Sequence, residues 1–239
     1  MTRRRIDIKN YRNFEKWYFE DWHHYDKKRL AIHRLYHAVL SWANKFASFD
    51  LLHGKGKAAL DVGCAHGYTV ELLSHFGYDA YGCDISRLYL GSYARKIARN
   101  LVLCDASKLP FFERSFDIIT AFELLEHLGN QYKFLTSCHD CLKPKGVLVL
   151  QTPRAIPSID AVLSKIYARA VSKSYSVEHH IGTITDKSNL GHLLDRCGFT
   201  YHVETWFLLP LNPTTFNRYF PTRIPMIVPT FRTVATRRN

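Results

Sequence analysis

Short apolar runs alternate with segments of helical periodicity through the middle of the chain. The apolar runs predict buried strands over residues 58–62, 79–83, 101–104, 116–120 and 147–151. The spacing of apolar positions between them predicts helices over residues 68–76, 86–97 and 131–142. Strands and helices that alternate along the chain are typical of a parallel sheet covered by helices. The pattern therefore predicts an α/β fold.

The two flanking regions add further elements. Residues 1–57 carry apolar positions at helical spacing: Ile32, Leu35, Tyr36, Val39, Trp42, Ala43 and Phe46. Residues 153–185 are predicted to form an insertion with a second amphipathic helix. The apolar face of that helix must be buried against one of three partners: the core, a hydrophobic substrate or a membrane surface.

The end of the chain predicts a helix, a strand and a final edge strand. The helix begins at a good cap near Thr185 and Asp186 and ends at Gly198. A sixth strand follows over residues 200–209, and either 226–228 or 231–235 supplies the last edge strand. Residues 143–146, Lys-Pro-Lys-Gly, predict a turn before the strand at 147–151.

The most informative stretch follows the first strand. Asp61 lies in that strand, and Gly63 and Gly67 mark a turn before the helix that starts at Tyr68. Glycine lacks a Cβ atom, so the chain can turn sharply there and a ligand can approach the backbone. The start of the following helix presents N–H groups and the positive end of its dipole to the same place. The stretch therefore predicts a ligand site.

The sequence Asp61-Val-Gly-Cys-Ala-His-Gly67, followed by Gly82-Cys-Asp-Ile-Ser86, resembles motifs I and II of class I methyltransferases that use S-adenosylmethionine. Two motifs in order are far more specific than one glycine turn. Ala65 departs from the family, which more often has glycine there. The resemblance implies a Rossmann-like, doubly wound, mainly parallel seven-stranded sheet with an N-terminal helical lid and an inserted cap helix.

The resemblance also implies S-adenosylmethionine as the cofactor, with contacts along the strand ends. Its amino acid end and sulfonium would face Asp61, Gly63, Cys64, Ala65, Gly67 and Tyr68. Asp84 would accept both ribose hydroxyls, Ile85 would pack on the adenine, and Asp105 with Ala106 would bind the adenine amino group. Glu123 is placed among the cofactor contacts, and Tyr25 and Arg29 would belong to the lid as an aromatic cover and a carboxylate-binding cation.

The block Glu123-Leu-Leu-Glu126-His127 looks like the E-x-x-E-H element of ubiquinone-pathway O-methyltransferases. In one interpretation these three side chains hold a divalent cation that lowers the pKa of a substrate hydroxyl. In a second, His127 is the general base beside Glu126. In a third, the block is only the start of a helix. His179 and His180 are a separate candidate pair, with His180 preferred as a base.

Charge and cysteine content indicate which partners and which compartment to expect for this protein. The formal charge is +12, and residues 58–200 hold 15 Lys and Arg against 14 Asp and Glu, so the basicity lies at both ends of the chain. Those ends predict peripheral contact with an anionic membrane or with nucleic acid, or else are simply solvated. We expect no membrane-spanning helix, no secretory signal and six reduced cysteines, hence a cytoplasmic protein.

These observations favour an O-methyltransferase acting on a small molecule or a lipid-linked acceptor. Residues 1–57 would form the lid, 58–152 the cofactor-binding half, 153–185 the substrate-side insertion, and 186–239 the last helix and edge strands. Methylation of an RNA ribose or tRNA through the basic ends is the alternative, and a non-catalytic relative that binds the cofactor is a third. No Asn/Asp-Pro-Pro-aromatic element of base methylation follows the fourth strand. The acceptor and the oligomeric state stay open.

Overall fold

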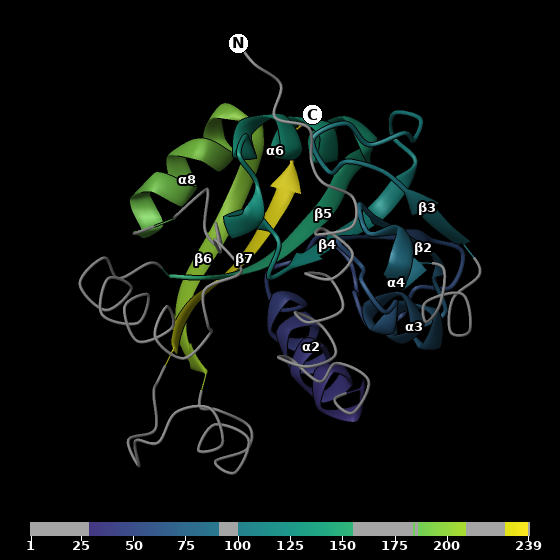
Figure 1. Ribbon diagram of the computed structural model, residues 1–239. Coiled ribbons are helices and arrows are strands. Elements are labelled where there is room, and N and C mark those ends of the chain that lie inside the picture. The colour runs from purple at the N-terminus through teal and green to yellow at the C-terminus, as the bar shows by residue number, and fades with distance from the viewer. Residues whose placement is uncertain (1–28, 91–99, 155–183, 185, 209–227, 239) are drawn as a thin grey trace, which may run out of the picture.

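The computed structural model describes residues 29–90, 100–154, 184, 186–208 and 228–238, and these residues contain one seven-stranded sheet (Figure 1). The strands are β1 (Ala58–Val62), β2 (Asp79–Asp84), β3 (Asn100–Leu103), β4 (Phe116–Phe122), β5 (Leu142–Pro153), β6 (Phe199–Leu208) and β7 (Val228–Arg237). The helices are α2 (Arg29–Ala43), α3 (Tyr68–His75), α4 (Arg87–Tyr89), α6 (Gln131–Cys141), α8 (Lys187–Arg196) and the 3-10 turn η4 (Leu125–His127).

The strands lie in the order β3-β2-β1-β4-β5-β7-β6. The first five are parallel to one another, and β7 is antiparallel to both β5 and β6. The chain leaves β1 toward one edge of the sheet and returns at β4 toward the other. The carboxyl ends of β1 and β4 therefore meet at a topological switch point, where open α/β sheets bind ligands. The expected doubly wound, mainly parallel sheet is confirmed.

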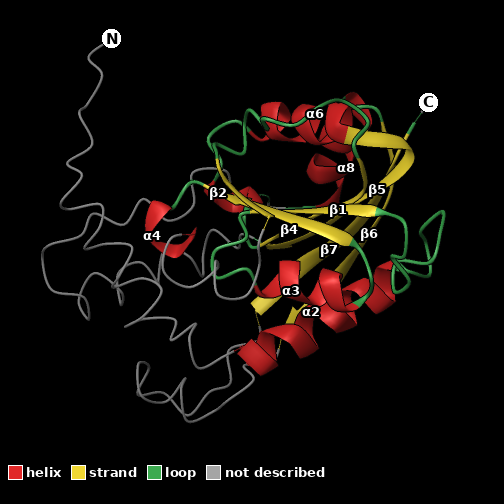
Figure 2. Cartoon of the chain, turned by 90° about the vertical axis from the view of Figure 1, so that its right-hand side faces the viewer, coloured by secondary structure: helices red, strands yellow, loops and turns green. Residues whose placement is uncertain are grey.

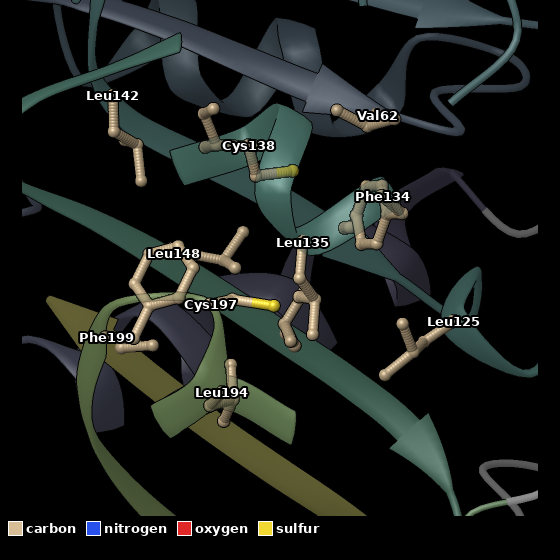
Figure 3. Packing of buried hydrophobic residues seen from close by; sticks show 14 of the residues in the cluster. Val62, Leu125, Phe134, Leu135, Cys138, Leu142, Leu148, Leu194, Cys197 and Phe199 are labelled. Atoms are coloured by element: carbon tan, nitrogen blue, oxygen red, sulfur yellow. The ribbon is translucent and has the colours of Figure 1, made fainter. Parts of the chain in front are cut away.

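Helices cover both faces of this sheet. Figure 2 shows α6 and α8 on one face and α2 and α3 on the other. Residues 147–150 of β5 are apolar at every position because this part of the strand is buried on both faces. Leu148 and Leu150 face α6 and α8, whereas Val147 and Val149 face α2. In Figure 3, side chains of α6 lie over this strand and beside those of α8, among them Phe134, Leu135, Cys138, Leu194 and Cys197.

The structure corrects two predictions near the end of the sheet. The last strand was expected at an edge, but β7 lies between β5 and β6, and β6 is the edge strand. Residues 143–146 were expected to form a turn before the fifth strand. They lie within β5 instead, as an irregularity with Lys145 at a φ of +63°, where the pairing shifts from Phe116–Leu142 to Ile118–Val147. The extra residues are accommodated as a bulge.

Other predictions are confirmed or lie outside the described residues. All six cysteines are free thiols, and Cys138 and Cys141 are buried in the core. No helix of the described residues is long and apolar enough to cross a membrane. Helix 86–97 is described only at its start, where Ser86 caps α4. Residues 1–28, most of the insertion at 153–185 and the tail at 209–227 lie outside the described residues.

The cap of α8 gives a stability prediction. The Asp186 carboxylate accepts the Asn189 N–H at 2.9 Å and so satisfies a donor of the first helical turn. We expect Asp186→Ala to lower the free energy of unfolding by about 1 kcal/mol in urea denaturation. The control Ser188→Ala, exposed in the same turn, should change it by less than about 0.5 kcal/mol. Equal effects of the two variants would contradict the capping role.

Candidate functional site

A glycine turn connects β1 to α3. The N–H groups of Gly63 and Cys64 both donate to the Cys83 carbonyl, at 2.8 and 3.0 Å, which holds the turn against the end of β2. Gly63 has a φ of +76°, a conformation that L side chains rarely adopt. A Cβ atom there would lie 3.0 Å from a methyl carbon of Leu124. The turn is therefore a cradle that favours glycine, and it lies against the segment that follows β4.

The turn ends at Gly67, which precedes α3 and has a φ of +77°. Its N–H donates to the Cys64 carbonyl at 2.7 Å. Because Gly67 has no side chain, the N–H groups of the first helical turn are not capped by it and can bind a ligand. Ala65 has a φ of +41°, which explains why glycine suits this position well. The turn expected at Gly63 and Gly67 is present, and Ala65 adopts a left-handed conformation within it.

Asp61 lies at the switch point. Its carboxylate is buried and accepts the hydroxyl of Thr120, its partner on β4, at 2.7 Å. Burial raises the pKa of Asp61 to about 7, while hydrogen bonds from Thr120 and Thr69 act in the opposite direction. A carboxyl group in this state ionises readily when a cation comes close. Asp61 is therefore suited to a positively charged ligand.

Asp84 connects the end of β2 to the glycine turn. One carboxylate oxygen accepts the Ala65 N–H and the other accepts the Ser86 N–H, both at 2.8 Å. Burial raises the pKa of Asp84, and these N–H donors counteract the effect. Each carboxylate oxygen has a second lone pair that can accept another hydrogen bond, so Asp84 can hold the turn and still bind hydroxyl groups.

The residues expected at the adenine lie at the neighbouring strand ends. Ile85 follows Asp84 and is 62% exposed, an unusual position for a large apolar side chain that a flat ring could cover. Asp105 is exposed after β3, and one carboxylate oxygen accepts the Ser107 N–H at 2.8 Å as a turn former. The Cys104 N–H donates to the Asp84 carbonyl at 3.0 Å. That bond joins the chain just after β3 to Asp84 at the end of β2. Asp105 and Ala106 therefore follow at the strand end next to Asp84.

A small hollow, open to solvent, lies between the glycine turn and α2. It is lined by Ile32, Tyr36, Asp61, Gly63, Cys64, Ala65, His66, Tyr68, Thr69 and Phe122. Of these, Ile32 and Tyr36 come from α2, and the Tyr36 ring lies 4.3 Å from that of Phe122 between centroids. Helix α2 therefore forms one wall of the hollow, and the role of residues 1–57 as a lid stays a prediction.

The lid cation Arg29 has a protein partner in this structure. Its guanidinium donates to both carboxylate oxygens of Glu71 on α3, and His33 Nε2 lies 3.0 Å from Glu71 Oε2. This pair connects the start of α2 to α3 beside the hollow. The role of Arg29 toward a ligand carboxylate stays a prediction. Tyr25, His179 and His180 lie outside the described residues.

Two acidic side chains follow β4. Glu123 has a φ of +54°, and its carboxyl accepts from Gln151 at 2.9 Å. Glu126 is buried and accepts the hydroxyl of Thr152 at 2.9 Å. Burial raises the pKa of Glu123 to about 7, and burial together with the charge of Glu123 raises the pKa of Glu126 to about 8. Strained backbone and paired, perturbed carboxyl groups are concentrated at functional sites.

His127 stands next to this pair. Its Nε2 lies 3.8 Å from Glu126 Oε1, and about a third of its side chain is exposed. A general base must lie near the acid that stabilises its charge and must also be accessible to the substrate. His127 lies near Glu126 and is partly exposed, so it meets both requirements. Among the described residues, no group of three or more His, Cys, Asp and Glu side chains is arranged to hold a metal ion.

The site includes residues that the sequence did not single out. His66 is buried in the turn, with its ring 4.7 Å from that of Tyr89 between centroids. Thr120 and Gln151 hold Asp61 and Glu123. A signal for Gln151 was present, because polar residues interrupt an apolar strand at its carboxyl end, where ligands bind. Thr120 gave no such signal, because a lone threonine in a strand is common.

Comparison with known proteins agrees with this geometry. The model of a family described as a methyltransferase domain matches residues 23–204. A ubiquinone biosynthesis O-methyltransferase from Paraburkholderia phymatum is 32% identical over 127 residues, 51% of this chain and 53% of that protein. A probable S-adenosylmethionine-dependent methyltransferase from Mycolicibacterium smegmatis is 26% identical over 52% of this chain and 49% of that protein. The match thus spans about half the length of these relatives.

Solved structures share the fold. The YcgJ protein from Bacillus subtilis superimposes with a TM-score of 0.65 at 17% identity, over 85% of this chain and 99% of that chain. Phosphoethanolamine N-methyltransferase 2 from Haemonchus contortus, solved in complex with S-adenosyl-L-methionine, gives a TM-score of 0.61 at 14% identity. That alignment covers 85% of this chain and 53% of that chain. At these identities the likeness is one of fold.

Proposed function

This chain belongs to the class I methyltransferases that use S-adenosylmethionine, and we propose that it methylates an oxygen atom of a small molecule or a lipid-linked acceptor. The names of two similar proteins support the choice of oxygen: ubiquinone biosynthesis O-methyltransferases from Paraburkholderia phymatum and Coxiella burnetii are 32% and 33% identical over the matched segments. The observation that carries the proposal is the pairing of His127 with a buried Glu126 directly after β4.

The described residues fit the cofactor. A Cβ at Gly63 would fill the cradle, and the hollow beside it has an acidic wall at Asp61, which suits the cationic amino and sulfonium groups. Asp84 lies at the adjacent strand end with lone pairs for the ribose hydroxyls. Ile85 supplies an exposed apolar surface for the adenine. The cationic groups, the ribose and the adenine of the cofactor thus each have a partner of matching chemistry.

Bound S-adenosylmethionine supplies a methyl carbon that an oxygen nucleophile can displace from sulfur. The protein's own contribution is alignment, exclusion of water and removal of a proton. We assign the proton of the acceptor hydroxyl to the His127 imidazole. Ionised Glu126, 3.8 Å away, stabilises the imidazolium that forms. Because the pKa of Glu126 is about 8, this stabilisation grows as the pH rises toward that value.

A second candidate function is methylation of RNA at a ribose or on tRNA. The net charge of +12, concentrated at the two ends of the chain, favours it. The same basic ends equally suit an anionic membrane surface that holds a lipid-linked acceptor. We place the RNA function second because the residues after β4 are Glu123-Leu-Leu-Glu-His, which resemble the E-x-x-E-H element of ubiquinone-pathway O-methyltransferases.

A panel of methyl acceptors with labelled cofactor separates these functions. Vesicles that contain a polyprenyl catechol, a soluble catechol and total RNA are each incubated with the protein and methyl-labelled S-adenosylmethionine. We expect label in the catechols as a methyl ether. Label in RNA alone would reverse the order of the two functions, and cofactor binding without transfer to any acceptor would favour a non-catalytic relative.

The raised pKa of Asp61 predicts a pH dependence of cofactor binding. A carboxyl that must ionise beside a cation, with a pKa of about 7 in the free protein, is mostly protonated at pH 6 and mostly ionised at pH 8. We therefore expect the Kd for S-adenosylmethionine to fall about tenfold between pH 6 and pH 8, as measured by calorimetry.

The control for this titration is Asp61→Asn, which keeps the side-chain shape but cannot ionise. Titration of the cofactor's own amino group affects both proteins equally, so only the difference between them reports on Asp61. We expect the variant to bind more weakly at pH 8 and to lose most of the pH dependence. Parallel curves for the two proteins would show that Asp61 does not face the cofactor's cationic end. The same carboxyl makes the free protein less stable as the pH rises from about 4 through 7, because the folded state holds its proton more tightly.

A further inference from the structure

A row of polar side chains crosses the sheet beyond the hollow. Gln151 of β5 is paired with Phe122 of β4 on one side and with Arg232 of β7 on the other. Arg232 is in turn paired with Glu204 of β6. Residues paired across neighbouring strands point to the same face of a sheet. Because Phe122 lines the hollow, this polar row continues from the hollow along the face that α2 covers.

Arg232 is the charged member of this row that lies deepest. The residue is 3% exposed, its Nε donates to Gln151 Oε1 at 3.3 Å, and its guanidinium stacks 3.7 Å from the ring centre of Trp206. Its Nη1 is buried and has no hydrogen-bond partner among the described residues. A buried cationic donor in that state is costly, so native proteins rarely keep one without a reason.

The nearest acid does not satisfy this donor. Glu204 accepts from the indole N–H groups of Trp42 and Trp206, at 2.9 and 3.1 Å, and from His202 at 2.9 Å. These hydrogen bonds lower the pKa of Glu204, and its carboxylate makes no hydrogen bond to Arg232 Nη1. Glu204 therefore offsets part of the charge of Arg232 through space without giving it a hydrogen bond.

A second donor lies beside Arg232. Thr230 is two residues earlier on β7, so both side chains point to the same face. Its hydroxyl is also buried and also has no hydrogen-bond partner among the described residues. One unsatisfied donor has many explanations, but two on adjacent same-face positions, one of them a guanidinium, match the oxygens of a single anionic group.

We propose that Arg232 and Thr230 bind a carboxylate or phosphate group of the methyl acceptor. The inference rests on the proposed function for the identity of the ligand as acceptor, and on the two unsatisfied donors for its charge. Arg232 lies two strands from Phe122, about 10 Å at the usual spacing of strands. The acceptor is thus a molecule whose acidic group sits about that far from the hollow where methyl transfer takes place.

Equilibrium binding tests this site without requiring turnover. Benzoate, phenyl phosphate and neutral benzyl alcohol are titrated into the full chain, with and without saturating S-adenosylhomocysteine, and followed by calorimetry. We expect at least one anion to bind about tenfold more tightly than benzyl alcohol. The benzoate and phenyl phosphate arms decide between a carboxylate and a phosphate. Equal affinities for the anions and the neutral probe would overturn the proposal.

Variants of the two donors sharpen the test. Arg232→Met should abolish the preference for the anion, and Thr230→Val, which keeps the shape, should reduce it severalfold while preserving the melting temperature. Arg232→Lys serves where the Met variant does not fold, and should also bind the anion more weakly because it lacks the guanidinium fork. Arg237→Met, at the other end of β7, removes the same charge and should leave the preference unchanged.

The two proposals fail in different ways. Anion binding that survives in both Arg232 variants and in Thr230→Val would overturn the acceptor site while leaving the methyltransferase assignment intact. Anion binding that depends on Arg232, in a protein that does not bind S-adenosylhomocysteine, would support the anion site and contradict the proposed function. With both intact, the anion-bearing acceptor should also show a lower KM than its neutral analogue, with Arg232→Lys raising that KM and changing kcat little.

Discussion

Asp84→Ala is expected to weaken binding of S-adenosylhomocysteine about 100-fold in calorimetry. The carboxylate of Asp84 accepts the N–H groups of both Ala65 and Ser86, so its removal frees the glycine turn as well as deleting the ribose partner. Hydrogen bonds to a charged group are worth about 1.5–3 kcal/mol each, and a net loss near 2.7 kcal/mol corresponds to that change in Kd.

The matched control lies at the other end of the same strand. Asp79 is exposed at the start of β2 and bonds to Tyr81 and Asn100, remote from the glycine turn. Asp79→Ala removes the same charge and should leave the Kd within about twofold of the wild type. If the two variants bound the cofactor equally well, Asp84 would have no role in holding it.

His127→Ala is expected to lower kcat for O-methylation by about 100-fold or more, the range for removal of a general base. Cofactor affinity should change little, because the imidazole is assigned to the acceptor's proton. Glu126→Gln should lower kcat by about tenfold, since the amide still accepts from Thr152 but cannot balance the charge of an imidazolium. The measurement is single-turnover transfer with labelled cofactor.

The pH profile distinguishes a base from a purely structural side chain. In the wild type, kcat should rise with pH as Glu126 ionises with a pKa of about 8, and this part of the rise should be absent in Glu126→Gln. His53→Ala, a change at an 82% exposed histidine far along the chain from the site, should leave both kcat and the profile as they are. A wild-type rate and profile in His127→Ala would remove this residue from the mechanism.

Much of the fold was predictable because its strands are short, apolar and separated by clear breaks. The run at 147–150 is apolar at every position, which only a strand buried on both faces requires. The place of β7 was not predictable. Its long-range pairing with both β5 and β6 depends on antiparallel register across the end of the sheet, and no local pattern at 228–237 encodes which neighbours it takes.

The same division holds for the site. Asp61 and Asp84 could be identified because each belongs to a motif contiguous in the sequence, and the structure brings both to the glycine turn. Arg232 and Gln151 are 81 residues apart and meet only through the pairing of β5 with β7. Their roles follow from their burial and from hydrogen-bond donors that lack partners. Both properties can be seen only in the folded structure.

The most direct test is a crystal structure of the full chain soaked or grown with S-adenosylhomocysteine. We expect difference density with the amino acid end in the hollow beside Asp61, the ribose hydroxyls on the carboxylate of Asp84, and the adenine between Ile85 and Asp105. Density for the ligand anywhere else, or a hollow that stays filled by protein at saturating ligand, would contradict this placement of the cofactor.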